Sequence, residues 1–354
     1  MKLPLSLLAS TLCSAFITTS ADASSFPKLP EAVSNNAVAL VQTKDDSYLV
    51  SFSGIDQRKD HHGVHNKVFV YQASKNKWQP ASAVPIKTPV NGLIGRLASV
   101  ATSIGEYAYV FGGYTVAEDH TEVSIPDVYR YDVKKDSYQS LEPMPVPVDD
   151  SIALTYQDRF IYLISGWHND GNVNLVQVYD VQNNRWQQAS PFPGKPVFGQ
   201  AGGIVDNTMV VCDGVKVDYY PEKRRGFSAE AACYKGVINE NDITKIHWTT
   251  LPHPTGTARY RMAAMGDKDT NEILFVGGSD NPYNYNGIGY NGKPATPTQG
   301  AWRFNIKDNQ WTIDQSHQST MDHRGLIKFN GQYITIGGMA DQQQVLDSVN
   351  SYTF

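Results

Sequence analysis

The sequence has little cysteine, little charge and no apolar run long enough to cross a membrane. Its 354 residues include three cysteines, and charged residues make up 18% of the chain. The formal net charge is only −5. No stripe of lysine or arginine breaks this mild balance, so we expect no nucleic-acid partner. The longest apolar run lies at the N-terminus and is shorter than the roughly 20 residues of a membrane-spanning helix, so we expect no membrane insertion.

Residues that favour strands and turns are abundant instead. The chain contains 20 tyrosines, 28 glycines and 19 prolines. Aromatic residues fit the pleated surface of a sheet, whereas glycine and proline supply tight turns. Hydrophobic residues make up 41% of the chain, which is enough for a packed core. The composition therefore predicts an all-β domain.

The N-terminus has the pattern of a secretory signal. Lys2 precedes a short apolar run over residues 3–17, and Ala21-Asp22-Ala23 provides small residues at the cleavage site. We predict a signal peptide over residues 1–23 and a single mature domain over 24–354, located in the periplasm or secreted.

Cleavage would leave two cysteines in the mature chain. An oxidising compartment permits a disulfide between Cys212 and Cys233. Two buried thiols are the alternative, because spacing alone does not establish pairing.

A glycine-ended apolar strand recurs six times, at a period of roughly 50 to 60 residues. The copies are Phe52-Ser53-Gly54, Phe111-Gly112-Gly113, Ile164-Ser165-Gly166, Cys212-Asp213-Gly214, Val276-Gly277-Gly278 and Ile336-Gly337-Gly338.

A second marker follows the first five copies. It is an aromatic strand, then a polar turn, then a tryptophan or tyrosine, and it ends at Trp78, Tyr138, Trp186, Trp248 and Trp311. A proline-rich corner usually comes next. We expect the large rings to pack between neighbouring sheets, where they bury much area.

These glycine pairs and spaced aromatic residues resemble the kelch family over essentially the whole mature chain. The resemblance implies a six-bladed β-propeller with four-stranded blades. The sixth copy lacks a fourth strand, and residues 26–30 (Phe-Pro-Lys-Leu-Pro) resemble the strand end and proline corner at 189–193. We predict that residues 24–30 complete the last blade as an N-terminal strand. A disordered N-terminal tail is the alternative.

The loops between the second and third strand of each blade are long and polar, so the face that carries them is the predicted functional face. Aromatic side chains there offer flat surfaces to sugar rings, and arginines at the starts of the innermost strands offer forked donors to a carboxylate. The predicted ligand-binding residues are Arg96, Trp167, Arg261, Arg324, Tyr283, Tyr285 and Tyr290. Salt bridges that hold loops, and plain loop packing, are the alternatives for the arginines and tyrosines.

Three histidines of the first blade, His61, His62 and His65, lie in one polar loop with Asp56 and Asp60. We interpret this loop as solvated and predict neither a metal nor a cofactor. The mature cysteines also lack the tyrosine and histidine partners that the copper radical oxidases among kelch propellers require.

The exported single-domain architecture is similar to the bacterial periplasmic sialic acid mutarotases (N-acetylneuraminate epimerases). That resemblance implies exchange of protons at an anomeric centre, for which His168, His323 and Asp150 are the candidates. The sequence departs from the family at Gly214-Val215-Lys216, because the family's proposed acid/base is a glutamate just after a glycine.

Two functions therefore stay open. The first is a monomeric binding protein that holds a carbohydrate, such as a sugar acid, or a protein partner without catalysis. The alternative is a sugar-acid mutarotase of the sialic acid type. The presence or absence of acid and base groups beside an arginine in one cavity discriminates between them.

Overall fold

The computed structural model describes residues 26–87, 89–90, 92–119 and 121–354. The predicted signal peptide and Ser24 lie outside these residues. In the described part of the chain, no helix is long and apolar enough to cross a membrane. The helical elements there are three short 3-10 turns, η1 (His61–Gly63), η2 (Ala73–Lys75) and η3 (Asp341–Gln343).

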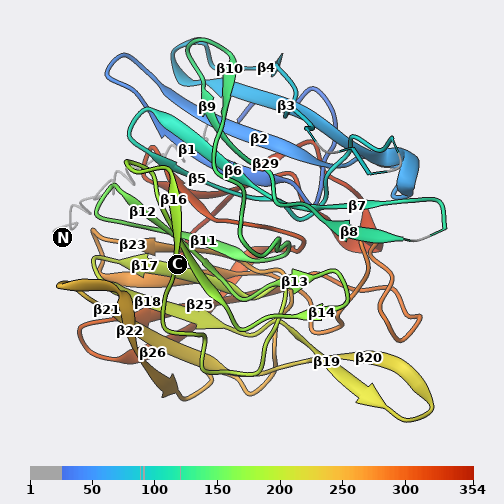
Figure 1. Cartoon of the computed structure of the whole chain (residues 1–354), viewed down its shortest axis with the longest axis vertical. Helices are drawn as coiled ribbons and strands as arrows, with labels where there is room; N and C mark the ends of the chain where they lie inside the picture. The colour runs from blue at the N-terminus through green and yellow to red at the C-terminus, as the bar shows by residue number, and fades with distance from the viewer. Residues whose placement is uncertain (1–25, 88, 91, 120) are drawn as a thin grey trace, which may run out of the picture.

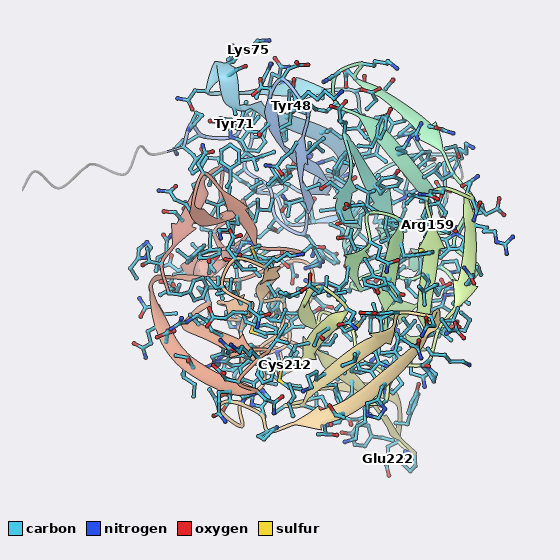
Figure 2. All side chains as sticks on the ribbon, turned by 90° about the vertical axis from the view of Figure 1, so that its left-hand side faces the viewer. Tyr48, Tyr71, Lys75, Arg159, Cys212 and Glu222 are labelled. Atoms are coloured by element: carbon cyan, nitrogen blue, oxygen red, sulfur yellow. A yellow bond between two sulfur atoms is a disulfide. The ribbon has the colours of Figure 1, made fainter. Side chains whose placement is uncertain are left out.

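Six antiparallel sheets follow one another around a ring in chain order, and the first sheet meets the last (Figure 2). The first three sheets have four strands each. Blade 1 contains β1 (Ala37–Gln42), β2 (Ser47–Ile55), β3 (Val64–Gln72) and β4 (Lys77–Ala81). Blade 2 contains β5 (Val100–Ile104), β6 (Tyr107–Phe111), β9 (Val128–Asp132) and β10 (Ser137–Ser140). Blade 3 contains β11 (Ile152–Tyr156), β12 (Phe160–Ile164), β15 (Val176–Asp180) and β16 (Arg185–Gln188).

The remaining three sheets complete the ring, and the last has three strands. Blade 4 contains β17 (Ala201–Val205), β18 (Thr208–Cys212), β21 (Cys233–Asn239) and β22 (Asp242–Leu251). Blade 5 contains β23 (Ala263–Asp267), β24 (Glu272–Val276), β25 (Thr298–Asn305) and β26 (Gln310–Thr320). Blade 6 contains β27 (Ile327–Phe329), β28 (Gln332–Ile336) and β29 (Val349–Tyr352). The prediction of a six-bladed all-β propeller is confirmed.

The repeated aromatic residues pack as the sequence predicted, both within and between blades. Tyr131 of β9 lies opposite Tyr138 of β10, with ring centroids 4.7 Å apart. The same Tyr131 ring meets Phe52 of blade 1 edge-on at 5.7 Å, so one side chain links two sheets. Phe111 and Tyr179 repeat this contact between blades 2 and 3 at 6.2 Å. Such buried ring pairs hold neighbouring blades together.

The closure of the last blade involves the N-terminal segment, although residues 26–30 form no strand. The backbone N–H of Leu29 donates to Asp347 O at 2.8 Å. In blade 3 the corresponding bond joins Phe192 N to Asn174 O at 2.9 Å, and both acceptors lie two residues before a third strand. Leu29 thus occupies the proline corner that follows a fourth strand.

The predicted fourth strand would lie before this corner, and residues 24 and 25 are outside the described part of the chain. The closing strand therefore stays a prediction. Phe26 packs against Tyr71 of blade 1 at 6.0 Å and Phe329 of blade 6 at 5.9 Å, so the segment lies at the seam between the first and last blades.

Three of the long loops contain hairpins that project on the same side of the ring (Figure 1). They are β7 (Tyr114–Val116) with β8 (Glu122–Ser124), β13 (Trp167–His168) with β14 (Gly171–Asn172), and β19 (Val215–Tyr220) with β20 (Lys223–Ala229). The paired glycine marker precedes each hairpin and has left-handed backbone at both positions, as at Ser165 (φ 54°) and Gly166 (φ 114°). A Cβ on Gly166 would lie 2.7 Å from Asp149 O, which explains why this position is glycine.

Candidate functional site

A cavity of about 240 Å³ lies on the hairpin face of the ring. Its walls come from blades 2 to 5, so no single repeat could form it. The lining residues are Tyr114, Glu122, Asp149, Asp150, Trp167, Phe198, Arg225, Phe227, Arg261, Asn284, Tyr285 and Tyr290.

The floor of this cavity is a buried cluster of two arginines and two aspartates. Arg261 donates to Asp150 through Nη2 and to Asp322 through Nη1, the latter at 3.0 Å. Arg324 reaches Asp150 through Nη2 at 2.7 Å. The four side chains are at most 2% exposed. The two positive and two negative charges balance, which is what makes their burial tolerable.

The cluster fixes the charge states of its members. Burial raises the pKa of Asp150, but the guanidinium groups of Arg261 and Arg324 outweigh it, so this pKa lies below its ordinary value. Burial lowers the pKa of Arg261, yet the attraction of Asp150 dominates and leaves this pKa well above its ordinary value. Both groups stay ionised across the physiological pH range.

A ring of backbone hydrogen bonds holds the cluster in place at the centre of the propeller. The residues just before the innermost strands have left-handed backbone, and their N–H groups donate from one blade to the preceding blade. Asp150 N donates to Ala98 O at 3.0 Å, Gly199 N to Asp150 O at 2.8 Å, and Arg261 N to Gly199 O at 2.9 Å. This ring separates the hairpin-face cavity from the central channel.

The channel on the other side of the ring has a cavity of about 290 Å³. The six innermost strands line it, together with Gln200, His323 and Arg324. Its other lining groups are mostly small, and the charged Lys328 there bonds Asp267 at 2.8 Å and Asp269 at 2.8 Å. The channel therefore offers fewer convergent chemical groups than the hairpin-face cavity.

Two carboxyl groups of the hairpin-face cavity come from blades 2 and 3. Asp149 is 3% exposed and accepts a hydrogen bond from Ser124 Oγ at 2.6 Å. Burial raises the pKa of Asp149 well above its ordinary value, and the charges of Asp150 and Glu122 raise it further. Glu122 lies two residues from Ser124 on β8, so both side chains are on one face of that strand. The cavity lining thus includes a buried carboxyl group with a raised pKa and a second acidic group from the neighbouring blade.

The walls of the cavity are aromatic and carry one further cation. The Phe227 and Tyr290 rings stack with centroids 4.3 Å apart, and the Trp167 ring lies 5.5 Å from Phe198. The Arg225 guanidinium lies 4.8 Å from the Trp167 ring centroid, within the range of a cation–π interaction. Flat rings beside a guanidinium suit a sugar with an acidic group.

The structure brings together five of the predicted site residues. Trp167, Tyr285 and Tyr290 lie in the cavity walls, and Asp150 and Arg261 lie in its floor. Asp150 and Arg261 are bonded to each other.

Two further predicted residues lie just behind the cavity. Tyr283 is fully buried. Its hydroxyl oxygen lies 3.5 Å from Oδ1 of Asp322, and its ring centroid lies 5.3 Å from the Arg261 guanidinium. Arg324 is on the channel side of the floor. Both support the cavity floor.

The other three predicted residues lie away from this cavity. Nδ1 of His168 bonds Pro147 O at 2.6 Å, although its neighbour Trp167 lines the cavity. His323 faces the channel and bonds Thr320, and burial lowers its pKa to about 4. Arg96 lies in a small cleft between blades 1 and 2, where burial lowers its pKa.

The three histidines of the first blade occupy different environments. His61 and His62 stack on each other in η1 with ring centroids 3.9 Å apart, whereas His65 is buried in β3, with its pKa lowered by burial to about 4.

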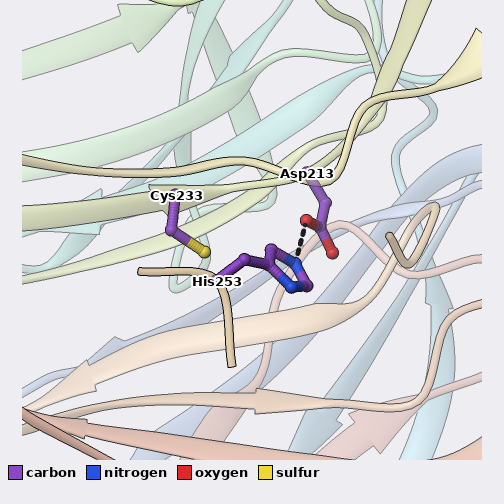
Figure 3. A group of neighbouring side chains, drawn as sticks. All are labelled: Asp213, Cys233 and His253. Atoms are coloured by element: carbon purple, nitrogen blue, oxygen red, sulfur yellow. Dashed lines mark hydrogen bonds and ion pairs between the residues drawn. The ribbon is translucent and has the colours of Figure 1, made fainter. Parts of the chain in front are cut away.

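A group of three side chains of types that can bind metals lies in blade 4, where Asp213, Cys233 and His253 are neighbours (Figure 3). Cys233 forms a disulfide with Cys212, its direct partner across β18 and β21, so it offers no thiolate. Nε2 of His253 bonds Asp213 at 2.7 Å, and its Nδ1 accepts from Gly256 N at 2.8 Å. We assign this group a structural role.

The sequence prediction missed Glu122 and Asp149 as site residues. Asp149 is adjacent to the predicted Asp150, and Glu122 lies in a long loop of blade 2. The only feature of the sequence that could have indicated Glu122 and Asp149 was their position in segments expected on the functional face. Arg225 lies in the long loop of blade 4, which the same reasoning placed on that face.

Comparison with known proteins agrees with the fold. Residues 36–278 match the family model of the KLHDC2/KLHL20/DRC7 Kelch-repeats domain. Human Kelch-like protein 15 is 19% identical over 302 residues, and the match covers 82% of this chain but only 45% of that protein. The chain thus spans less than half the length of this relative.

Other relatives match along nearly their whole length. The N-acetylneuraminate epimerase of Pasteurella multocida is 23% identical over 381 residues, which cover 94% of this chain and 93% of that protein. The Salmonella typhi enzyme of the same name is 21% identical, with 97% and 94% covered. The solved structure of YjhT superposes with a TM-score of 0.69 at 15% identity, covering 93% of this chain and 97% of that one. The chain is therefore a member of the kelch-repeat family, a six-bladed β-propeller related to the N-acetylneuraminate epimerases.

Proposed function

We propose that this protein is an exported sugar-acid mutarotase that interconverts the two anomers of a carboxylated sugar in its hairpin-face cavity. The observation that carries the proposal is the pairing of two carboxyl groups, Asp149 and Glu122, beside an arginine and aromatic walls. The near full-length match to the N-acetylneuraminate epimerases supports it. The predicted signal peptide supports export to the periplasm.

The reaction requires one acid and one base. Asp149, whose pKa burial raises well above its ordinary value, acts as the acid and donates a proton to the ring oxygen. Glu122 takes the proton from the anomeric hydroxyl, the ring C–O bond breaks, and an open-chain carbonyl compound forms. The carbonyl rotates, and the ring oxygen attacks its other face as both protons return. No atom or electron is gained or lost.

The ligand carboxylate has its best partner in Arg225. Arg261 already binds Asp150 and Asp322, so it serves the floor of the cavity and not the ligand. Arg225 lines the cavity and its Nη1 donates to Asp170 O at 2.9 Å. Because a guanidinium has five N–H donors, it can hold a ligand carboxylate as well.

The test is anomer exchange of N-acetylneuraminic acid, followed by NMR magnetisation transfer. We expect Asp149→Asn and Glu122→Gln each to lower the catalysed exchange rate roughly 100-fold, the lower end of the usual contribution of general acid–base catalysis. Glu118→Gln is the matched control, because Glu118 is exposed in the same hairpin outside the cavity lining.

The binding of the sugar acid should persist in both cavity variants, measured by calorimetry. Binding without any catalysed exchange in the native protein would contradict the mutarotase proposal and favour the non-catalytic binding protein. Exchange that is unaffected in both variants would contradict the assigned acid and base.

A further inference from the structure

The hairpin of β19 and β20 projects away from the sheets of the ring (Figure 1). At its base, Val215 is fully buried and exchanges two backbone hydrogen bonds with Phe198, at 2.9 and 3.1 Å. At its far end, Tyr219 is 72% exposed and Tyr220 is 46% exposed. These two tyrosines belong to the few large apolar side chains that the described surface exposes to this extent.

The cavity wall continues outwards along this hairpin. Phe227 and Arg225 of β20 both line the cavity and, being two residues apart, lie on one face of the strand. Next along the hairpin, Arg225 bonds Asp170 at the tip of the β13–β14 hairpin. Beyond it, the Tyr219 hydroxyl lies 3.3 Å from where a Cβ on Gly171 would be. The seam between the two hairpins therefore leads from the aromatic cavity to the exposed ring of Tyr219, whereas Tyr220, the next residue of β19, is on the opposite face of the strand.

The size of the cavity limits what it encloses. Its volume of about 240 Å³ is just below the range of roughly 300–1,000 Å³ that is usual for small-molecule sites. It therefore has room for one sugar unit, and a second unit linked to the first must lie outside. The direction with flat aromatic surface is the seam that leads to Tyr219.

We infer that Tyr219 forms an outer subsite for a second sugar, so that the preferred ligand is an acidic oligosaccharide with its reducing-end unit in the cavity. This inference rests on the proposed function. Opening of the ring requires a free anomeric hydroxyl, which only the reducing-end unit of an oligosaccharide has. The other hydroxyls of that unit can carry the linkage to the second sugar.

Tyrosine suits such an exposed subsite. Its ring is an amphipathic surface that can stack on the C–H face of a sugar, and its hydroxyl can bond a sugar oxygen. Few torsions are frozen when it binds, because the side chain has only two χ angles.

The experiment compares N-acetylneuraminic acid with its reducing dimer on the native protein and on the variant Tyr219→Ala. We expect the dimer to bind the native protein about tenfold more tightly than the monomer, measured by calorimetry. This preference should vanish in Tyr219→Ala, while the monomer affinity and the monomer exchange rate stay unchanged. Ile313→Ala, which removes a 57% exposed side chain from β26 in another blade, is the matched control.

Three results would overturn the inference. Equal affinities for dimer and monomer, or a dimer preference that survives in Tyr219→Ala, would mean that Tyr219 forms no subsite. A protein that exchanges the monomer but excludes the dimer would retain the proposed function and lose this extension of it. Failure of both sugars to bind the native protein would overturn the two together.

Discussion

Replacement of Arg261 by methionine tests whether the buried charge cluster holds the centre of the propeller together. The native side chain is 2% exposed and bonds both Asp150 and Asp322. Methionine keeps much of the length but removes the charge, leaving two buried carboxylates with one arginine, Arg324. Removal of one partner from a buried ion pair usually costs about 3–5 kcal/mol, because the remaining charge is left uncompensated. We expect a loss of that size in the free energy of unfolding.

Arg303→Met is the matched control. Arg303 also has two carboxylate partners, Asp314 at 2.9 Å and Glu272 at 3.6 Å, but its side chain is 26% exposed. Ion pairs that water reaches contribute about 0–1 kcal/mol. Urea unfolding followed by tryptophan fluorescence measures both variants. Equal losses for Arg261→Met and Arg303→Met, or a loss below about 1 kcal/mol at Arg261, would refute the assignment of a structural cluster.

The same comparison has a defined pH dependence. The folded pKa of Asp150 lies below its ordinary value. Its ion pairs therefore contribute stability at pH values above the unfolded pKa of about 3.9, and this contribution is lost as the pH falls through the folded pKa. The stability difference between the native protein and Arg261→Met should be constant near neutral pH and should shrink below about pH 4.

Further predictions concern other parts of the ring. Joint replacement of Cys212 and Cys233 by alanine removes a bond that closes a sequence separation of 21 residues, and we expect a loss of about 3 kcal/mol in urea unfolding; an unchanged midpoint would contradict the bond. Leu29→Ala should lower the stability by about 2–5 kcal/mol, because Leu29 is buried at the closing seam, whereas Lys28→Ala, at an exposed ion pair, should change little. Burial lowers the pKa of His323 to about 4 in the folded protein. Between pH 6.5 and 4 this histidine is therefore protonated in the unfolded chain but not in the folded protein, so the free energy of unfolding should decrease as the pH falls. His323→Gln should flatten this decrease, and an equally steep decrease in that variant would contradict the prediction.

The sequence predicted the ring because each repeat contains its own structural signals. The glycine of each pair is required by a left-handed backbone next to a close contact, as at Gly166. The aromatic pair Tyr131 and Tyr138 is set by a short hairpin. These requirements are local, so they are visible in any one copy and become decisive when they recur six times. The corner at Leu29 was predictable for the same reason.

The candidate site was predictable only as a face of the ring. The three arginines predicted to bind a ligand carboxylate lie apart from a shared ligand site, because Arg261 and Arg324 turn towards Asp150, whereas Arg96 lies in a cleft between blades 1 and 2. No pattern in the sequence predicts which charged side chains will form ion pairs between different blades.

The number of blades, their order and the face with the long loops were predictable from the amino-acid pattern, since these features depend on short-range backbone geometry and on repetition. Which side chains share the cavity depends on how the blades pack. Asp149 and Glu122 belong to different blades, and the raised pKa of Asp149 arises from burial and from neighbouring charges. Burial and charge are properties of the assembled ring, because each depends on atoms that distant repeats supply.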